Sequence, residues 1–251
     1  MPLIILMYAV SLILTLSPVG ELFFRQLNNV RDLYTYKEKE YLMPIFDEVY
    51  SEIEKKHPNI NQNTGIYIID EMTINACAIG RHTVAVTQGA IETLSKEQLK
   101  GLISHEFGHL IHGDTIINMI IYLGGGIFSI PLILAKIAMY FIEILAFMLD
   151  RSRVSSFIIS IFKFIINILM IVFTFIIQIG LAINNRKHEF QADMFAHEIG
   201  FGSELISAFY TLQKTSLKGK ESISNKLKAT HPHMARRIGA LEKAQGIEYI
   251  A

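Results

Sequence analysis

The residues of this sequence that point most directly to chemistry are the five at His105-Glu106-Phe107-Gly108-His109. On a helix, side chains four residues apart project from one face a turn apart, so both imidazoles can reach the same ion. Tetrahedral zinc accepts such a pair, and the intervening glutamate then lies beside the metal as a general base. Zinc lowers the pKa of its bound water, and the glutamate takes up the proton while the hydroxide attacks a peptide carbonyl. The motif therefore predicts a hydrolytic zinc centre, although a chance match is expected in roughly one such chain in fifty.

A hydrolytic zinc site needs a third protein ligand and an open fourth position. Glu189 is the best candidate, and Asp193 follows it by four residues, so a helix presents both carboxylates on one face. Glu189 would bind the metal, while Asp193 would accept a hydrogen bond from the far nitrogen of a ligand histidine. The same spacing is common on solvated helix faces, so this assignment depends on the histidine motif.

These residues resemble the HtpX-like membrane zinc metallopeptidases, which are relatives of the CAAX prenyl endopeptidases. The family pattern is HExxH, an aspartate five residues beyond the second histidine, and a later Arg-x-x-Glu-[Phe/Tyr]-x-Ala-Asp. The positions that match it are His105, Glu106, His109, Asp114, Arg186, Glu189, Phe190, Ala192 and Asp193. The resemblance implies one zinc ion per chain, with His105, His109 and Glu189 as ligands. It also implies that Asp193, Asp114 and Arg186 support those ligands.

Two further segments extend the resemblance. Residues 75–78 match the family's Asn-Ala-x-Ala segment, which pairs with extended substrate, and this implies substrate contacts at Asn75, Ala76 and Ala78. Residues 230–232 match its Thr-His-Pro, which implies that His231 stabilises the oxyanion of the tetrahedral intermediate. From the residues alone, His231 is equally well read as a turn histidine before a proline.

The composition indicates that part of the chain lies in lipid. Hydrophobic residues make up 51% of the chain, charged residues only 18%, and the mean hydropathy is +0.36. Residues 3–24, 116–149 and 154–183 are each apolar enough to span a bilayer. We therefore predict an N-terminal membrane anchor over 1–24 and a transmembrane helical hairpin over 116–183, inside which Lys136 and Glu143 could pair.

A hairpin returns the chain to the side that it left, so residues 25–115 and 184–251 can form the two parts of one catalytic domain. Basic residues follow the first apolar stretch closely, which favours a multi-pass protein of the inner cell membrane with its catalytic face toward the cytoplasm. The basic residues of the hairpin link, Arg151 and Arg153, argue against that orientation.

The position of the ligands along the chain predicts the class of substrate. His109 precedes the second apolar stretch by seven residues, and Glu189 follows the third by six. On helices, both would lie about 10 Å from the start of an apolar span. We therefore expect the partners to be the lipid bilayer and protein or peptide substrates, mainly misfolded or membrane-proximal segments of membrane proteins. The formal net charge of +0 and the absence of a basic tract argue against nucleic acid.

The fold class predicted is α+β: a mainly helical zincin-type protease domain with a small β-sheet, plus transmembrane helices. Short strands are expected at 65–70, 75–80 and 83–87, and a helix at 39–56 that restarts at Pro44. The helix that carries the histidine motif should begin at Ser95, where Gln98 completes a capping box.

Three other functions are considered. A small-molecule transporter or channel is poorly supported, because three spans with few intramembrane charges show no paired repeat. A prenyl-protein endopeptidase of the CAAX type would share the zinc site but should have more spans and a longer chain. A catalytically silent membrane protein could keep the zinc as a structural element, but its sequence would be expected to lack the glutamate at position 106, which is present.

Overall fold

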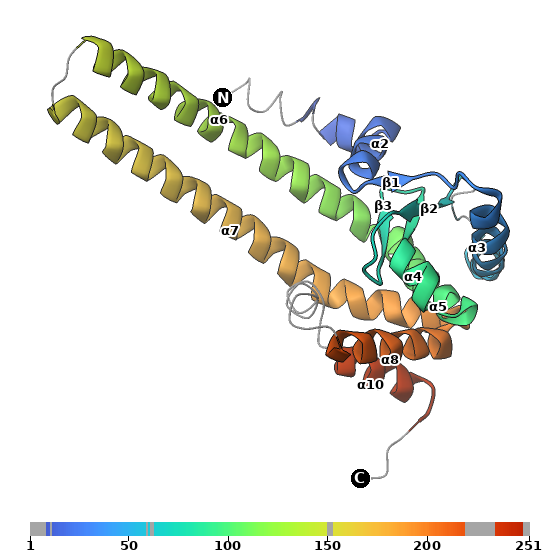
Figure 1. The fold of residues 1–251 in the computed structure, drawn as a ribbon. Coiled ribbons are helices and arrows are strands. Elements are labelled where there is room, and N and C mark those ends of the chain that lie inside the picture. Colours follow the sequence, from blue (N-terminus) through green and yellow to red (C-terminus); the bar gives the residue numbers. More distant parts are fainter. Residues whose placement is uncertain are drawn as a thin grey trace. The chain divides into compact units, whose positions relative to one another are not determined.

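The computed structural model describes residues 9, 10, 12–58, 60, 63–149, 153–218 and 234–247 (Figure 1). The chain divides into two compact units. The first comprises Met1–Thr15 and Ile120–Leu181, and the second comprises Leu16–Met119 and Ala182–Ala251. All the residues of the predicted metal site whose side chains are described belong to the second unit.

One mixed sheet lies in the second unit, with the strand order β1-β2-β4-β3. Its strands are β1 Val30–Arg31, β2 Gly65–Ile69, β3 Ala76–Ile79 and β4 Thr83–Thr87. β2 and β4 are parallel, whereas the pairs β1–β2 and β3–β4 are antiparallel. Three strands agree with the predicted ones, and two residues of β1 are too few to show an alternating pattern. Within the described part of the chain, β3 forms an edge of the sheet (Figure 1).

Six described helices lie wholly within the second unit. They are α2 Pro18–Leu27, α3 Tyr36–Lys56, α4 Gln88–Thr93, α5 Lys96–His112, α8 Gly202–Lys218 and α10 Met234–Ala244. Two longer helices, α6 (Asp114–Leu149) and α7 (Arg153–Glu198), each contribute one end to this unit. The observed architecture confirms the predicted α+β class, mainly helical with a small sheet.

The restart predicted at Pro44 for the helix over 39–56 is wrong, because α3 runs through this proline without interruption. A capping box between Thr35 and Glu38 begins the helix. Proline removes only one hydrogen bond of the helix ladder, and packing of an apolar face stabilises the rest. The buried residues of that face are Leu42, Ile45, Phe46, Val49 and Ile53.

Helix α5 starts as predicted from its capping residues. The Ser95 hydroxyl accepts a hydrogen bond from the Gln98 amide at 3.2 Å, and the Gln98 side chain accepts one from the Ser95 amide at 3.0 Å. The helix ends at Gly113, whose φ of 75° is left-handed. Its middle is buried from Leu99 to Gly108, and it packs against α3, α8 and the sheet. The histidine motif is therefore carried on a rigid central element.

The predicted N-terminal anchor extends into the second unit. Residues 1–8 lie outside the described part, and helical residues at 12–16 are followed by Ser17, which caps α2. One face of α2 buries Gly20, Glu21 and Phe24. Its other face exposes Val19, Leu22, Phe23 and Leu27. The second half of the predicted anchor thus contributes buried side chains to the unit that carries the metal site.

In the first unit, long stretches of α6 and α7 correspond to the predicted transmembrane hairpin over 116–183. Among the described residues, Phe157–Phe175 is long and apolar enough to cross a membrane. Glu143 on α6 pairs with Lys163 on α7, so the suggested pairing of Glu143 with Lys136 is wrong. A partner on the neighbouring helix can approach more closely than one seven residues away on the same helix. The link at 150–152 lies outside the described residues.

Candidate metal centre

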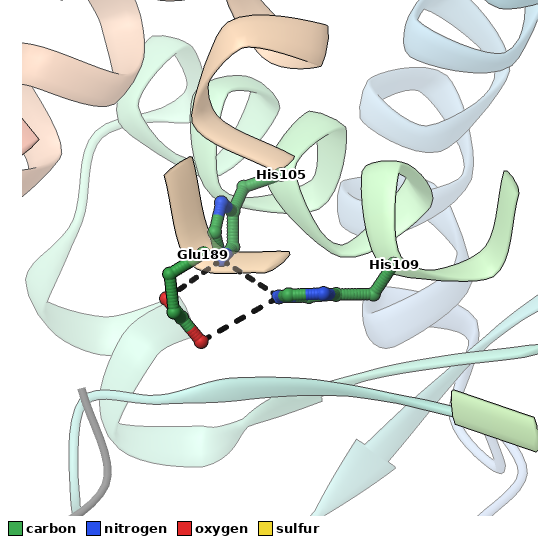
Figure 2. A group of neighbouring side chains, drawn as sticks. All are labelled: His105, His109 and Glu189. Carbon is green, nitrogen blue, oxygen red and sulfur yellow. Dashed lines mark hydrogen bonds and ion pairs between the residues drawn. The ribbon is translucent and has the colours of Figure 1, made fainter. Parts of the chain in front are cut away.

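His105, His109 and Glu189 bring three metal-binding atoms together in the second unit. Figure 2 shows their side chains converging on one point. The two Nε2 atoms are 3.2 Å apart, and the Glu189 oxygens lie 3.6 Å from His105 Nε2 and 3.7 Å from His109 Nε2. Ligands about 2.0–2.1 Å from a tetrahedral zinc ion are about 3.3 Å from one another. The three separations therefore suit one zinc ion with a fourth position open.

The partners of the two imidazoles explain why a cation fits between them. His109 Nδ1 lies 2.9 Å from an Asp114 oxygen, and His105 Nδ1 lies 3.0 Å from an Asp193 oxygen. A carboxylate at Nδ1 favours the tautomer with its proton there. Both Nε2 atoms then present lone pairs to each other, an arrangement that a cation between them stabilises.

The local electric field also favours positive charge at this point. Burial by itself would lower the pKa of His109, but its bond to Asp114 and the charges of Glu106 and Glu189 raise it. Three carboxylates around this half-buried imidazole thus favour a cation, either a proton or a metal ion. The donor set, two imidazoles and a carboxylate, is one that zinc accepts.

Close packing of two helices brings Glu189 to the histidines. Gly108 on α5 faces Ala192 on α7, and a Cβ on Gly108 would lie 2.8 Å from the Cα of Ala192. Real Cβ atoms do not approach a backbone so closely, so the glycine permits this separation of the helices. Gly108 of the histidine motif and Ala192 of the glutamate segment therefore pack directly against each other.

Sequence reasoning did not select Arg237, which is buried at the centre of the site. Its guanidinium binds both oxygens of Asp193, at 2.6 and 2.7 Å, and Nη1 lies 2.7 Å from a Glu189 oxygen. Burial would raise the pKa of Asp193, but the bonds from Arg237 and His105 lower it, so the carboxylate stays charged. A signal was present in the sequence. Arg237 lies in the apolar stripe of Met234, Ile238 and Leu241, and an arginine in such a stripe needs a buried partner.

Asp114 connects His109 to a second histidine for which sequence reasoning gave no role. While one oxygen of Asp114 faces His109, the other lies 2.8 Å from Nδ1 of His188. Asp114 begins α6 and is 3% exposed, and His188 immediately precedes Glu189 on α7. Asp114 therefore links the ends of α5, α6 and α7 around the site.

Glu106, the predicted general base, is buried on α5 beside His105. Its charge raises the pKa of His109 and, together with burial, contributes to raising the pKa of Cys77 on β3 to about 12. The charge of Glu106 therefore acts both on a metal-binding histidine and on the edge strand. The Cys77 thiol therefore stays protonated at neutral pH.

The register of β3 shows which of its backbone groups face outward. Asn75 accepts a hydrogen bond from the Thr87 amide at 3.0 Å and donates one to the Thr87 hydroxyl, so its backbone faces β4. Because backbone direction alternates along an antiparallel strand, Ala76 and Ala78 direct their N–H and C=O groups away from β4. These two residues present backbone hydrogen-bonding groups along the edge.

Two predicted site residues cannot be placed in this site. Residue 186 lies within α7, but the side chain of Arg186 is outside the described part of the structure. His231 falls in 219–233, which also lies outside it. Their roles stay predictions.

Comparisons with known proteins agree with this geometry. The family described as peptidase family M48 matches residues 37–245. Protease HtpX of Legionella pneumophila (strain Corby) is 41% identical over 59 residues, which cover 22% of this chain and 21% of that protein. A protease HtpX homolog of Bacteroides fragilis is 29% identical over 233 residues, which cover 82% of this chain and 69% of that protein.

A second HtpX homolog and a solved structure extend the comparison. The homolog from Helicobacter acinonychis is 28% identical over 205 residues, covering 73% of this chain and 62% of that one. The match thus covers less than two thirds of the length of the Legionella and Helicobacter relatives. The crystal structure of Ste24p from S. mikatae has a TM-score of 0.55 and 19% identity, and it covers 95% of this chain and 56% of that one. This likeness shows a shared fold.

Proposed function

We propose that this chain, which belongs to peptidase family M48, is a membrane-anchored zinc-dependent endopeptidase. The observation that carries the proposal is the convergence of His105, His109 and Glu189 beside the buried Glu106. Zinc held there would polarise a peptide carbonyl and lower the pKa of a water molecule. Glu106 would take the proton of that water and pass it to the leaving amine.

The neighbouring carboxylates would keep the ligands in position. Asp193 would orient His105, and Asp114 would orient His109, each by accepting a hydrogen bond from Nδ1–H. Arg237 would hold Asp193 and Glu189 and balance part of their charge. We retain the predicted supporting role of Arg186 and the predicted oxyanion contact of His231, both from the family resemblance.

The edge position of β3 among the described strands supports an extended mode of substrate binding. The outward backbone groups of Ala76 and Ala78 would pair with an extended peptide, adding a strand to the sheet. Main-chain pairing depends little on side chains, so we expect broad specificity. Such specificity suits a protease that removes misfolded proteins.

We further propose that substrates are membrane proteins cut close to the bilayer, with the catalytic face toward the cytoplasm. Phe157–Phe175 could cross a membrane, and Glu189 follows it on the same helix, α7. The excess of basic residues after the first apolar stretch supports the orientation. A matched pair of substrates tests the location: one unfolded segment, either soluble or tethered to a transmembrane helix. Faster cleavage of the tethered form is expected, and equal rates would contradict a membrane-proximal site.

The decisive test of the activity compares the wild type with Glu106→Gln in detergent. Both are purified with a chelator, zinc is added back, and cleavage of casein is followed on a gel. Glutamine keeps the shape of the side chain but cannot accept the proton, so zinc should bind while hydrolysis stops. Glu97→Gln on the exposed start of α5 is the matched control and should cleave like the wild type. Identical fragments from the Glu106 variant and the wild type would reject Glu106 as the base.

A further inference from the structure

A buried carboxylate outside the metal centre holds the turn that joins β3 to β4. Glu21 on α2 is 8% exposed, although it lies within a largely apolar stretch. One of its oxygens accepts hydrogen bonds from the His82 amide at 3.1 Å and from the Thr83 hydroxyl at 2.6 Å. The other accepts from the Arg81 amide at 3.0 Å and lies 3.0 Å from His82 Nδ1. One side chain thus binds three successive residues of the turn.

The chemistry of these contacts shows that Glu21 acts as a charged anchor. Burial alone would raise its pKa, but the bonds from Thr83, Arg81 and His82 lower it. Gly80 begins the turn with a left-handed φ of 61°, and a Cβ there would collide with the Glu21 carboxylate. A glycine at position 80 is therefore needed both for the backbone conformation of the turn and for the close approach of the Glu21 carboxylate.

A hydrogen bond also joins the turn to the start of α6, next to a residue that contacts a metal-site histidine. The Thr115 hydroxyl donates to the Gly80 carbonyl at 2.6 Å, and Thr115 follows Asp114, which contacts His109. A continuous set of contacts thus runs from α2 through the turn to the start of α6. Both Glu21 and Thr115 are buried, so water does not replace these bonds readily.

The position of β3 depends on this turn more strongly than the position of β4 does. β4 pairs with strands on both sides, whereas β3 pairs with β4 alone among the described strands. At its beginning, β3 is fixed by the bonds between Asn75 and Thr87. At its end, it is fixed by the turn that Glu21 holds. Ala76 and Ala78, whose backbones face outward, lie between these two points.

We propose that Glu21 is a positioning residue for substrate: through the Gly80–Thr83 turn, it holds the edge strand β3 where an extended peptide pairs with it. This inference rests on the proposed peptidase function and adds a residue from the N-terminal helix to it. Glu21 touches neither the reacting atoms nor the metal ligands. Its loss should therefore weaken peptide binding and leave zinc binding and the chemical step intact.

The test compares Glu21→Gln with the wild type and with Glu38→Gln as the matched control. Glutamine would direct an amide N–H₂ group at donors of the turn, whereas Glu38 binds Arg31 and the start of α3, away from the turn. For casein cleavage we expect Glu21→Gln to raise KM about 5–20-fold, with kcat and zinc affinity within about twofold of the wild type. Thr83→Val, a milder change that removes one donor, should raise KM about 2–5-fold. Glu38→Gln should leave KM unchanged.

A second measurement separates this proposal from the proposed activity. In the non-hydrolysing Glu106→Gln background, Kd for fluorescein-labelled denatured casein is measured by anisotropy, and amide hydrogen exchange is followed over residues 76–83. Weaker binding and faster exchange on adding Glu21→Gln support the proposal, even if the wild type cleaves nothing. Unchanged Kd and exchange would overturn it, as would a loss of kcat and zinc affinity with KM unaltered.

Discussion

The guanidinium of Arg237 and the carboxylate of Asp193 form a two-pronged, fully buried ion pair between residues 44 positions apart. Asp193 also faces His105, and Arg237 also reaches Glu189. The C-terminal helix α10 thereby supplies the positive charge that lies among several acidic groups of the metal centre. Without it, Glu189 and Asp193 would be two close buried carboxylates, one of which would tend to take up a proton.

We therefore predict that Arg237→Gln lowers zinc affinity about 10–100-fold, the range usual for residues that support metal ligands. The affinity is measured by competition with a zinc-binding dye in detergent. Arg237→Lys keeps the charge but not the two-pronged geometry, so it should recover only part of the affinity. The neighbouring Arg236 is exposed, and Arg236→Gln should bind zinc like the wild type. Equal affinity for the two glutamine variants would show that Arg237 does not support the ligands.

A second prediction concerns the contact between α5 and α7. Gly108→Ala would place a methyl group against the backbone of Ala192, so the helices must separate and Glu189 must move away from the histidines. We expect zinc affinity to fall at least about tenfold, because a ligand displaced by several tenths of an ångström no longer completes the site. Gly239 on α10 has nothing within 4 Å of an added Cβ, so Gly239→Ala is the matched helix control. Similar zinc affinities for both variants would contradict the role of this packing.

A third prediction concerns Asp114, which lies between His109 and His188. Asp114→Asn keeps the shape but removes the charge and can present an N–H₂ group to an imidazole. We expect zinc affinity to fall about 10–100-fold. Asp70→Asn, which affects a surface ion pair with Arg31, serves as the control and should leave zinc affinity unchanged. The contribution of His188 is measured separately with His188→Asn, for which a smaller loss of zinc affinity is expected. No loss in Asp114→Asn would remove Asp114 from the support of His109.

The sequence allowed the central part of the site to be predicted, because its residues lie at helical spacing. His105 with His109, and Glu189 with Asp193, are four apart, and each pair shares one face of its helix. The capping box at Ser95 likewise depends on residues three apart. Such short-range relationships need no tertiary structure.

The contacts of the metal centre and of the β3–β4 turn that the sequence did not predict are long-range. Arg237 and Glu21 reach partners 44 and 61 residues away in sequence, and no local pattern records such pairs. Glu21 also lies in a segment that reads as a membrane anchor, and its burial depends on the turn that it meets. The restart predicted at Pro44 does not occur, because tertiary packing of α3 outweighs the local effect of a proline.

A final prediction concerns stability at the start of α3, outside the metal centre. Glu38 binds the Arg31 guanidinium at 2.9 Å and accepts bonds from the amides of Tyr34 and Thr35. The bond from Arg31, followed by that from Thr35, lowers the pKa of Glu38 from its ordinary 4.5 to about 2. The folded protein thus binds the charged carboxylate more favourably than the unfolded chain does.

A lowered pKa in the fold means that this stabilisation is complete above pH 4.5 and is lost as the pH falls toward 2. At pH 7, Glu38→Gln should therefore lower the apparent Tm by about 2–4 °C, measured by thermal unfolding in detergent. As the pH falls from 4.5 toward 2, the difference from the wild type should shrink toward zero, because the wild-type carboxyl is protonated first in the unfolded chain and, near pH 2, in the fold as well. Glu40→Gln changes an exposed residue of the same helix and should show little difference at either pH. A Tm difference for Glu38→Gln that stays constant from pH 7 to pH 2.5 would assign its effect to helix capping by shape alone, not to charge.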